Sequence, residues 1–385
     1  MKIQHVITTL DVGGAEMHLL SQVRGQCERG HQVRIAYLKG DGRLTQDYLE
    51  AGADQILPIG TGPMTPFRLA RAVGWSDITH SHLLKADAIT ACVATMIGAR
   101  KRLISGKHND ERALLNPWVS RIHGFLGNLP VKTIVLSDHV GRFVEEHGRV
   151  KPAKLERVYY GIDPQPFERA AATPASDKEA LRCEFGFDAA DVVFTCVARF
   201  AAQKAHDVLL RAFRHAIDTA PAECPRLRLL LVGDDPFGDG REKAEAVARE
   251  LALGDAVVFA GIRRDVPLIL ASSDVFVMSS LWEGLGLVFL EAMAVSIPVL
   301  STRVSAIPEV VVDGETGLLV APGEDLPLAK AALQLALQPA LRKELGSAGR
   351  QRVLEHFGLD RMVDETLAIY RRVSGIGSPA SIGSA

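Results

Sequence analysis

The sequence has little of what marks a secreted, membrane-spanning or nucleic-acid-binding protein. It contains five cysteines in 385 residues, and no two of them have C-x-x-C spacing, which argues against a disulfide framework or a zinc ribbon. Its first residues lead directly into a strand-like segment rather than a signal peptide. No apolar run reaches the ~18 residues that a membrane-spanning helix needs, and no basic run is interleaved with aromatic residues, so no nucleic-acid partner is expected. We therefore expect a cytoplasmic protein with reduced thiols.

Apolar and charged residues occur in the proportions of a globular protein. Hydrophobic residues make up 47% of the chain and charged residues 23%, and the length is enough for two domains with cores of ordinary size. The net charge of −2 is unevenly spread, because the first 163 residues carry an excess of five positive charges and the remainder an excess of seven negative ones. A basic N-terminal half favours an anionic substrate or peripheral contact with an anionic membrane surface, but a solvated surface without a partner explains it equally well.

Short apolar segments alternate with helical patterns along the whole chain. The first strands are expected at residues 3–8 and 33–37, and a second series begins near residue 191. Such alternation predicts an α/β protein with parallel, doubly wound sheets, whose ligands bind outside the carboxyl ends of the strands. Residues 164–180, rich in Pro, Ala, Ser and charged residues, are predicted to be a linker. Residues 375–385 are predicted to be a flexible tail.

The most informative segment is residues 279–300, where a glycine-bearing turn and a helical pattern lie between two strand-like runs. This order places a helix N-terminus at the carboxyl edge of a parallel sheet, where a phosphate is stabilised. Glu283 lies in the turn and Glu291 in the helix, at most roughly 12 Å apart at helical rise. Carboxylates accept hydrogen bonds from hydroxyl groups, so the pair suits a ligand with hydroxyls at both ends and phosphates between them. Two glutamates at this spacing also occur by chance, so the wider context has to decide.

That wider context is Glu-Gly-x-Gly-Leu from Glu283, Leu-Glu-Ala-Met-Ala from Leu290, and the dipeptide Pro298-Val299. Together they resemble the signature of family 4 glycosyltransferases, and the resemblance spans nearly the whole chain, most strongly residues 191–320. It implies the GT-B fold, two Rossmann-like domains facing a deep interdomain cleft. On this basis residues 1–164 form an acceptor-side domain joined by a C-terminal helix at about 360–374, and residues 181–358 form the domain that binds the nucleotide sugar.

Two cations lie at the strand-to-helix turn that follows residues 191–197. Arg199 and Lys204 would repel each other there unless an anion joined them, and their Arg-x-x-x-x-Lys spacing matches the diphosphate-binding pair of the family; two solvated surface cations are the alternative. The resemblance also places His108 near the transferred sugar, with His82 as a weaker candidate and a structural role as the alternative for both. The expected catalytic residues are His108, Arg199, Lys204 and Glu283.

The remaining positions implied by the resemblance bind the donor. Residues 13–14 would face its diphosphate, although a tight turn explains two glycines as well. Gly233 and Asp234 would lie near the nucleotide, and Ile262 where the backbone contacts the base. Glu283 would hold sugar hydroxyls and Glu291 the ribose, while helix N–H groups would hold the diphosphate. The expected donor-binding residues are therefore Gly13, Gly14, Gly233, Asp234, Ile262, Gly284, Leu285, Gly286, Leu287 and Glu291.

The resulting prediction is a retaining glycosyltransferase (EC 2.4, hexosyltransferase-like) that moves a sugar from a UDP- or GDP-sugar to a carbohydrate or lipid-linked acceptor, as in cell-surface polysaccharide synthesis. We expect no cofactor and no metal, because no Asp-x-Asp triplet occurs. A nucleotide-sugar epimerase of the same two-domain plan and a non-catalytic nucleotide-sugar-binding protein are the alternatives. Ser296, and the pair Ser305-Ala306, stand where the family usually has glycine, so a left-handed backbone there would be strained.

Overall fold

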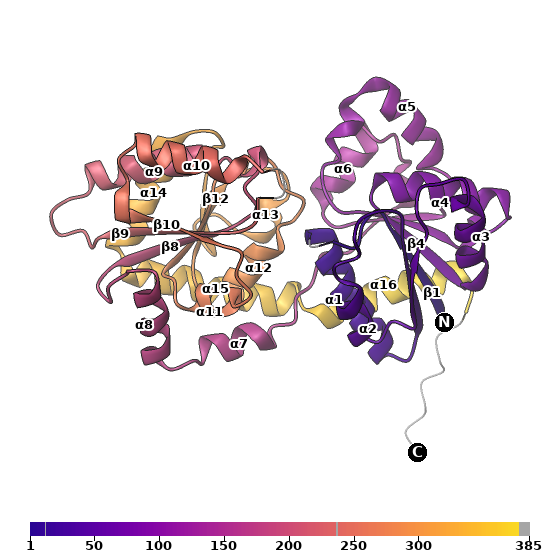
Figure 1. Cartoon of the computed structure of the whole chain (residues 1–385), viewed down its shortest axis with the longest axis horizontal. Helices are drawn as coiled ribbons and strands as arrows, with labels where there is room; N and C mark the ends of the chain where they lie inside the picture. The colour runs from indigo at the N-terminus through magenta and orange to yellow at the C-terminus, as the bar shows by residue number, and fades with distance from the viewer. Residues whose placement is uncertain (12, 236–237, 377–385) are drawn as a thin grey trace, which may run out of the picture. The chain divides into compact units, whose positions relative to one another are not determined.

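The computed structural model describes residues 1–11, 13–235 and 238–376, and the chain forms two compact units (Figure 1). The first consists of Met1–Gly161 together with the C-terminal segment that begins at Gly358, and the second is Ile162–Phe357. In the part of the chain that is described, no helix is both long and apolar enough to cross a membrane. Most of the predicted tail, residues 377–385, lies outside the described residues.

The first unit is built on a parallel sheet of seven strands in the order β3-β2-β1-β4-β5-β6-β7. Its strands are β1 (Lys2–Ile7), β2 (Gln32–Tyr37), β3 (Gln55–Pro58), β4 (Ile78–His82), β5 (Leu103–Lys107), β6 (Lys132–Val135) and β7 (Leu155–Arg157). Its helices are α1 (Gly14–Glu28), α2 (Thr45–Glu50), α3 (Thr65–Trp75), α4 (Leu84–Met96), α5 (Pro117–Leu126), α6 (Asp138–Glu146) and α16 (Leu359–Ser374), with short 3₁₀ helices at Arg100–Arg102, Arg112–Leu115 and Pro152–Lys154.

The C-terminal helix α16 packs against α1 and completes the core of the first unit. Gly25 of α1 is the point of close approach, because a Cβ there would lie 2.6 Å from the side chain of Val363. Next to this contact, the Arg29 guanidinium donates to Asp364 at 2.8 Å and to Asp360 at 2.9 Å. The last helix in the sequence is therefore held beside the first by packing and by charge-assisted hydrogen bonds.

The second unit has a parallel sheet of six strands in the order β10-β9-β8-β11-β12-β13. Its strands are β8 (Val192–Val197), β9 (Leu227–Val232), β10 (Val257–Gly261), β11 (Val275–Met278), β12 (Val299–Thr302) and β13 (Gly317–Val320). Helices cover the sheet, so its strands are nearly continuous apolar runs. The helices are α7 (Gln165–Ala171), α8 (Ala175–Glu184), α9 (His206–Thr219), α10 (Gly240–Glu250), α11 (Val266–Ala271), α12 (Leu287–Ala294), α13 (Ile307–Val310), α14 (Asp325–Leu337) and α15 (Pro339–His356), with 3₁₀ helices at Ala202–Lys204 and Gly254–Ala256.

The prediction of a linker at residues 164–180 is wrong, because α7 and the first part of α8 occupy this segment. A proline lies in the first turn of α7, where a missing N–H costs nothing and the fixed φ favours the helix. Phe167 and Ala170, three residues apart on one face, are buried, and α7 packs against α11. The prolines and alanines that resembled a linker are thus helix-starting and helix-forming residues.

Both serines that replace glycines have left-handed backbones, with φ of +66° at Ser296 and +47° at Ser305. Ser296 ends α12 in a Schellman motif: its N–H donates to the Met293 carbonyl at 3.0 Å, and the Ile297 N–H donates to the Ala292 carbonyl at 3.3 Å. A serine side chain in this conformation is strained. The predicted strain is therefore present at the C-terminus of the helix that carries Glu291.

We expect Ser296→Gly to stabilise the protein by about 1 kcal/mol, because glycine adopts the left-handed conformation without a Cβ clash. Chemical denaturation followed by circular dichroism measures the change. Ser347→Gly, at an exposed position inside α15, is the control and should destabilise by about 0.5 kcal/mol. Equal losses of stability in Ser296→Gly and Ser347→Gly would show that Ser296 is not strained.

Candidate functional site

The carboxyl ends of β8, β9 and β10 converge at one edge of the second sheet. The Phe200 N–H donates to the Asp234 carbonyl at 2.8 Å, and the Gly233 N–H donates to the Gly261 carbonyl at 2.9 Å. Gly233 allows this approach, because a Cβ there would lie only 1.9 Å from the Ala198 carbonyl oxygen. The loop containing Arg199, the Gly233-Asp234 turn and Ile262 therefore lie at the same edge, as predicted from the strand ends.

Arg199 and Lys204, which the sequence assigned to one anion, have different surroundings. Arg199 is exposed and forms no ion pair within the described part of the chain. Lys204 is largely buried, and its ammonium pairs with the Glu283 carboxylate. The same carboxylate oxygen accepts the Ser280 hydroxyl at 2.7 Å. The structure thus brings together Lys204 and Glu283, whose contact the sequence analysis did not predict.

Hydrogen bonds fasten the loop after β8 to the loop after β11, which carries Glu283. The Leu281 N–H donates to the Gln203 carbonyl at 2.8 Å, and the Gln203 amide donates to the Trp282 carbonyl at 2.7 Å. The Ser279 hydroxyl donates to the Lys204 carbonyl at 2.9 Å. These bonds fix the backbone on both sides of the ion pair, so the pair is positioned before any ligand binds.

The helix α12 begins at the end of the Glu283 loop. Its N-cap, Gly286, has a φ of +77°, and a Cβ there would lie 2.5 Å from the ring of Phe289. The free N–H groups of the first turn follow directly, starting at Leu287. Glu291, one turn further, has no hydrogen-bond or ion-pair partner in the described structure, and burial raises its pKa from 4.5 to about 7. The predicted order of turn, helix N-terminus and second carboxylate is therefore present.

A cavity of about 480 Å³ in the second unit lies next to this edge, between α9 and α10. Its lining includes Ala202 and Ala205, which flank Lys204 in sequence, but none of the predicted site residues. The predicted residues of the second unit thus lie at the edge of its sheet rather than around this cavity.

In the first unit, Gly13 and Gly14 begin α1. A Cβ at Gly13 would lie 2.4 Å from a carboxylate oxygen of Glu16, which also accepts the Thr9 hydroxyl at 2.6 Å. A Cβ at Gly14 would meet nothing within 4 Å. Gly13 has an extended backbone with a φ of −164°, which any residue can adopt, and Gly14 leaves open space beside the helix N-terminus. Residue 12, which precedes them, lies outside the described residues.

The imidazole of His108 faces the interior of the first unit and is 9% exposed. Its Nε2 bonds to His82 Nδ1 at 2.8 Å, and its Nδ1 bonds to the Tyr160 hydroxyl at 2.5 Å. Burial, together with the nearby Lys107 ammonium, lowers the pKa of His108 to about 3. His108 is thus neutral at physiological pH and both of its nitrogens are occupied within its own domain.

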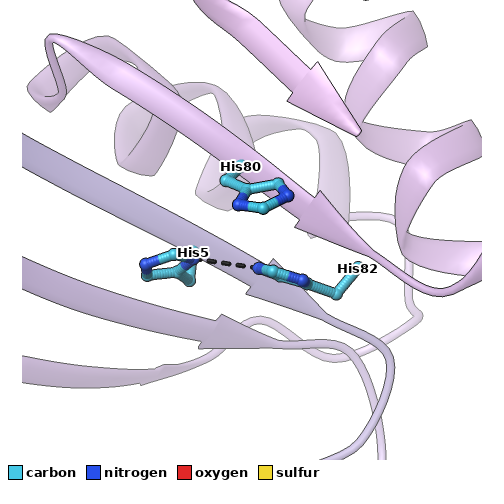
Figure 2. A group of neighbouring side chains, drawn as sticks. All are labelled: His5, His80 and His82. Atoms are coloured by element: carbon cyan, nitrogen blue, oxygen red, sulfur yellow. Dashed lines mark hydrogen bonds between the residues drawn. The ribbon is translucent and has the colours of Figure 1, made fainter. Parts of the chain in front are cut away.

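The sequence analysis missed two further histidines of this network, His5 and His80. His5 Nδ1 bonds to His82 Nε2 at 2.9 Å (Figure 2). His5 on β1 pairs in register with His80 on β4, and His80 and His82 share one face of their strand because side chains alternate along it. The alternation His80-Ser81-His82 is the signal in the sequence, but it indicates a cluster only once β1 is known to lie beside β4.

Comparison with known proteins finds a family match for each half of the chain. Residues 177–352 match the family described as glycosyl transferases group 1, and residues 12–166 match the family described as glycosyltransferase family 4. The chain is 30% identical to N-acetyl-alpha-D-glucosaminyl L-malate synthase of Bacillus anthracis, over 96% of this chain and 97% of that one. It is 33% identical to D-inositol 3-phosphate glycosyltransferase of Stackebrandtia nassauensis, over 97% and 91%.

Solved structures share the fold over almost the whole chain. HepE of Anabaena, in complex with UDP, superimposes with a TM-score of 0.83 at 22% identity, covering 96% of this chain and all of that one. Sucrose-phosphate synthase of Thermosynechococcus elongatus gives a TM-score of 0.79 at 20% identity, with 98% and 100% covered. At these identities the likeness concerns the fold alone.

The raised pKa of Glu291 predicts a pH-dependent stability. A carboxyl group whose pKa rises from 4.5 to about 7 on folding contributes stability below pH 4.5, and this contribution is lost as the pH rises through 7. Between pH 5 and pH 8.5 we expect wild type to lose about 1–2 kcal/mol relative to Glu291→Gln, a value reduced for the partial exposure of the side chain. Urea denaturation at several pH values measures this.

Glu250→Gln, an exposed variant at the end of α10, is the control and should follow wild type at every pH. If the free energy of unfolding of Glu291→Gln changes with pH as that of wild type does, Glu291 is ionised between pH 5 and pH 8.5 and its pKa is not raised.

Proposed function

Because the chain belongs to glycosyltransferase family 4, and is thus an enzyme of the GT-B fold as its sequence predicted, we propose that it transfers a sugar from a UDP- or GDP-sugar to an acceptor hydroxyl with retention of anomeric configuration. The observation that carries the donor assignment is the edge of the second sheet. There, Arg199, which forms no ion pair among the described residues, lies at the same edge as the Lys204–Glu283 pair, and Glu283 belongs to the loop that leads into α12.

Stabilisation of the departing diphosphate is the main catalytic contribution in this proposal. Arg199 and Lys204 would neutralise its developing charge, and the N–H groups at the start of α12 would add donors and a favourable dipole. These groups perform the task that a divalent metal performs elsewhere, so we propose metal-independent donor binding. Glu283 would accept hydrogen bonds from sugar hydroxyls, and Glu291 from the ribose.

The state of His108 supports retention. An inverting enzyme needs a general base that deprotonates the acceptor opposite the leaving group. His108 was the only such candidate among the predicted residues, and its pKa of about 3 and its bonds to His82 and Tyr160 make it unsuitable. We therefore propose attack on the same face as the leaving group, assisted by a departing phosphate oxygen, with His108 positioned by its neighbours beside the sugar.

We propose an anionic or lipid-linked acceptor, and the surface of α5 supports contact with a membrane. Trp118, Ile122 and Phe125 are 73%, 61% and 72% exposed and recur at helical spacing on one face. The Arg121 guanidinium lies 5.9 Å from the Trp118 ring, so aromatic and basic groups occur together, as in helices that lie on anionic membranes. The helix also borders a cavity of about 320 Å³ lined by Val119, Ile122 and Leu126, among others.

Arg199→Ala and Lys204→Ala should each lower the transfer rate by on the order of 10²–10³, as expected for removal of a charge-stabilising donor. Lys204→Ala also leaves the buried Glu283 carboxylate without its cation, so its stability has to be measured in parallel. Lys330→Ala, on the exposed face of α14, is the matched control. Normal turnover in both variants would refute the diphosphate assignment.

The function itself is tested by incubating the protein with UDP- and GDP-sugars and a panel of acceptors, including L-malate, inositol 3-phosphate and polyprenyl phosphosugars. Mass spectrometry should detect a glycosylated acceptor, and proton NMR of the first-formed product should show an α linkage from an α donor. Activity should survive EDTA. A β-linked product would refute retention. Epimerised donor without any sugar transfer would show that the protein is a nucleotide-sugar epimerase instead.

Membrane contact is tested by co-sedimentation with vesicles of phosphatidylglycerol or of phosphatidylcholine. We expect binding to the anionic vesicles and at least a tenfold loss in the double variant Trp118→Ser, Phe125→Ser, because apolar insertion and charge act together. Phe67→Ser, equally exposed on α3, should bind as wild type does. Unchanged vesicle binding by the double variant would show that α5 is not the membrane-contacting surface.

A further inference from the structure

Three histidines of the first unit converge in its interior. His5 of β1 and His80 and His82 of β4 lie on one face of neighbouring strands, and all three are 0–2% exposed. One ring nitrogen of each lies within 4.8 Å of one ring nitrogen of both others. Figure 2 shows His5 and His82 facing each other, with His80 next to this pair.

One nitrogen of each ring is held by a different group. His5 Nε2 bonds to the Gln26 amide oxygen at 2.9 Å, His80 Nδ1 to the Tyr370 hydroxyl at 2.6 Å, and His82 Nδ1 to His108 Nε2 at 2.8 Å. An amide oxygen, a hydroxyl oxygen and an imidazole nitrogen can all accept a hydrogen bond. Metal-binding histidines have this arrangement: one nitrogen binds the ion and the other donates to an acceptor that fixes the ring.

A separate observation concerns the second ring nitrogen of His80, Nε2. This nitrogen is buried and has no hydrogen-bond partner among the residues that the structure describes, which is unusual for a buried polar atom. A small cavity of about 10 Å³, which His18, His80, Gly106 and His108 help to line, lies beside it. A Cβ at Gly106 would lie 2.7 Å from this nitrogen, so glycine keeps the space open.

We propose that His5, His80 and His82 bind one divalent transition-metal ion of the zinc type, through His5 Nδ1, His80 Nε2 and His82 Nε2. The ion replaces the hydrogen bond between His5 and His82, which lies at 2.9 Å, and a water molecule would complete its tetrahedral coordination beside the three imidazole nitrogens.

The ion has a structural role in this proposal, because it connects the two central strands to both flanking helices. Gln26 belongs to α1 and Tyr370 to α16, so the ligands and their partners join the N-terminal and C-terminal segments of the unit. The site lies within the first unit, whereas the proposed donor edge lies in the second. It therefore adds a metal to the protein without assigning one to the diphosphate.

The test uses the full-length protein purified without chelator from zinc-supplemented medium. Plasma mass spectrometry should find about one zinc per chain, and His80→Gln and His82→Gln should each lower this content at least tenfold. Zinc should raise the melting temperature of chelator-treated wild type and leave that of the two variants unchanged. His123→Gln is the matched control, since His123 is buried in the same unit with both nitrogens bonded, to the Gly148 carbonyl and to Lys107.

X-ray absorption of the wild-type protein keeps the test independent of variant folding, and should show imidazole scattering at the 2.0–2.1 Å typical of Zn–N bonds. Cobalt added in place of zinc should give the visible absorption of a tetrahedral site. The proposal would be overturned if wild type carried no metal and its melting temperature did not depend on zinc. It would also be overturned if His80→Gln kept the metal content of wild type. Either result would leave a water molecule as the partner of His80.

Discussion

The buried ion pair between Lys204 and Glu283 fixes the edge of the second sheet at which we propose that the donor binds. It neutralises a carboxylate in the interior, and a buried charge that loses its partner is strongly destabilising. Because Lys204 follows β8 and Glu283 follows β11, the pair connects two loops that the strand order places side by side. The turn into α12, and with it the helix N-terminus, is positioned by this one contact and by the hydrogen bonds around it.

The architecture could be predicted because it rests on local patterns. Apolar runs of strand length and helical periodicity between them are sufficient to predict parallel α/β sheets, and the glycines of the 279–300 segment predict a strand-turn-helix unit. The helices α7 and α8 could not be predicted from composition, since proline and alanine occur both in linkers and at helix starts. The burial of Phe167 and the packing of α7 against α11 show that this segment is a helix of the second unit and not a linker.

The site was only partly predictable, because its interactions join residues far apart in sequence. The order of Arg199, Lys204, Glu283 and Glu291 around the strand ends follows from the motif, but the Lys204–Glu283 contact spans 79 residues, and no local pattern encodes it. The histidine cluster has the same origin. His5 meets His80 because β4 lies beside β1 in the sheet, so a doubly wound strand order, applied to the polar residues of the strands, would have indicated the cluster.

If the donor binds as proposed, the unequal states of the two cations would couple its two ends. Arg199 has no ion-pair partner in the described part of the chain and would meet a diphosphate without losing one, whereas the Lys204 ammonium is already held by Glu283. In the proposed donor complex, a phosphate that attracts Lys204 weakens its hold on Glu283, and the freed carboxylate oxygen then accepts hydrogen bonds from the sugar. Free nucleotide diphosphate would leave that carboxylate partly uncompensated. The intact donor satisfies both groups at once, so this pair favours nucleotide sugar over nucleotide alone.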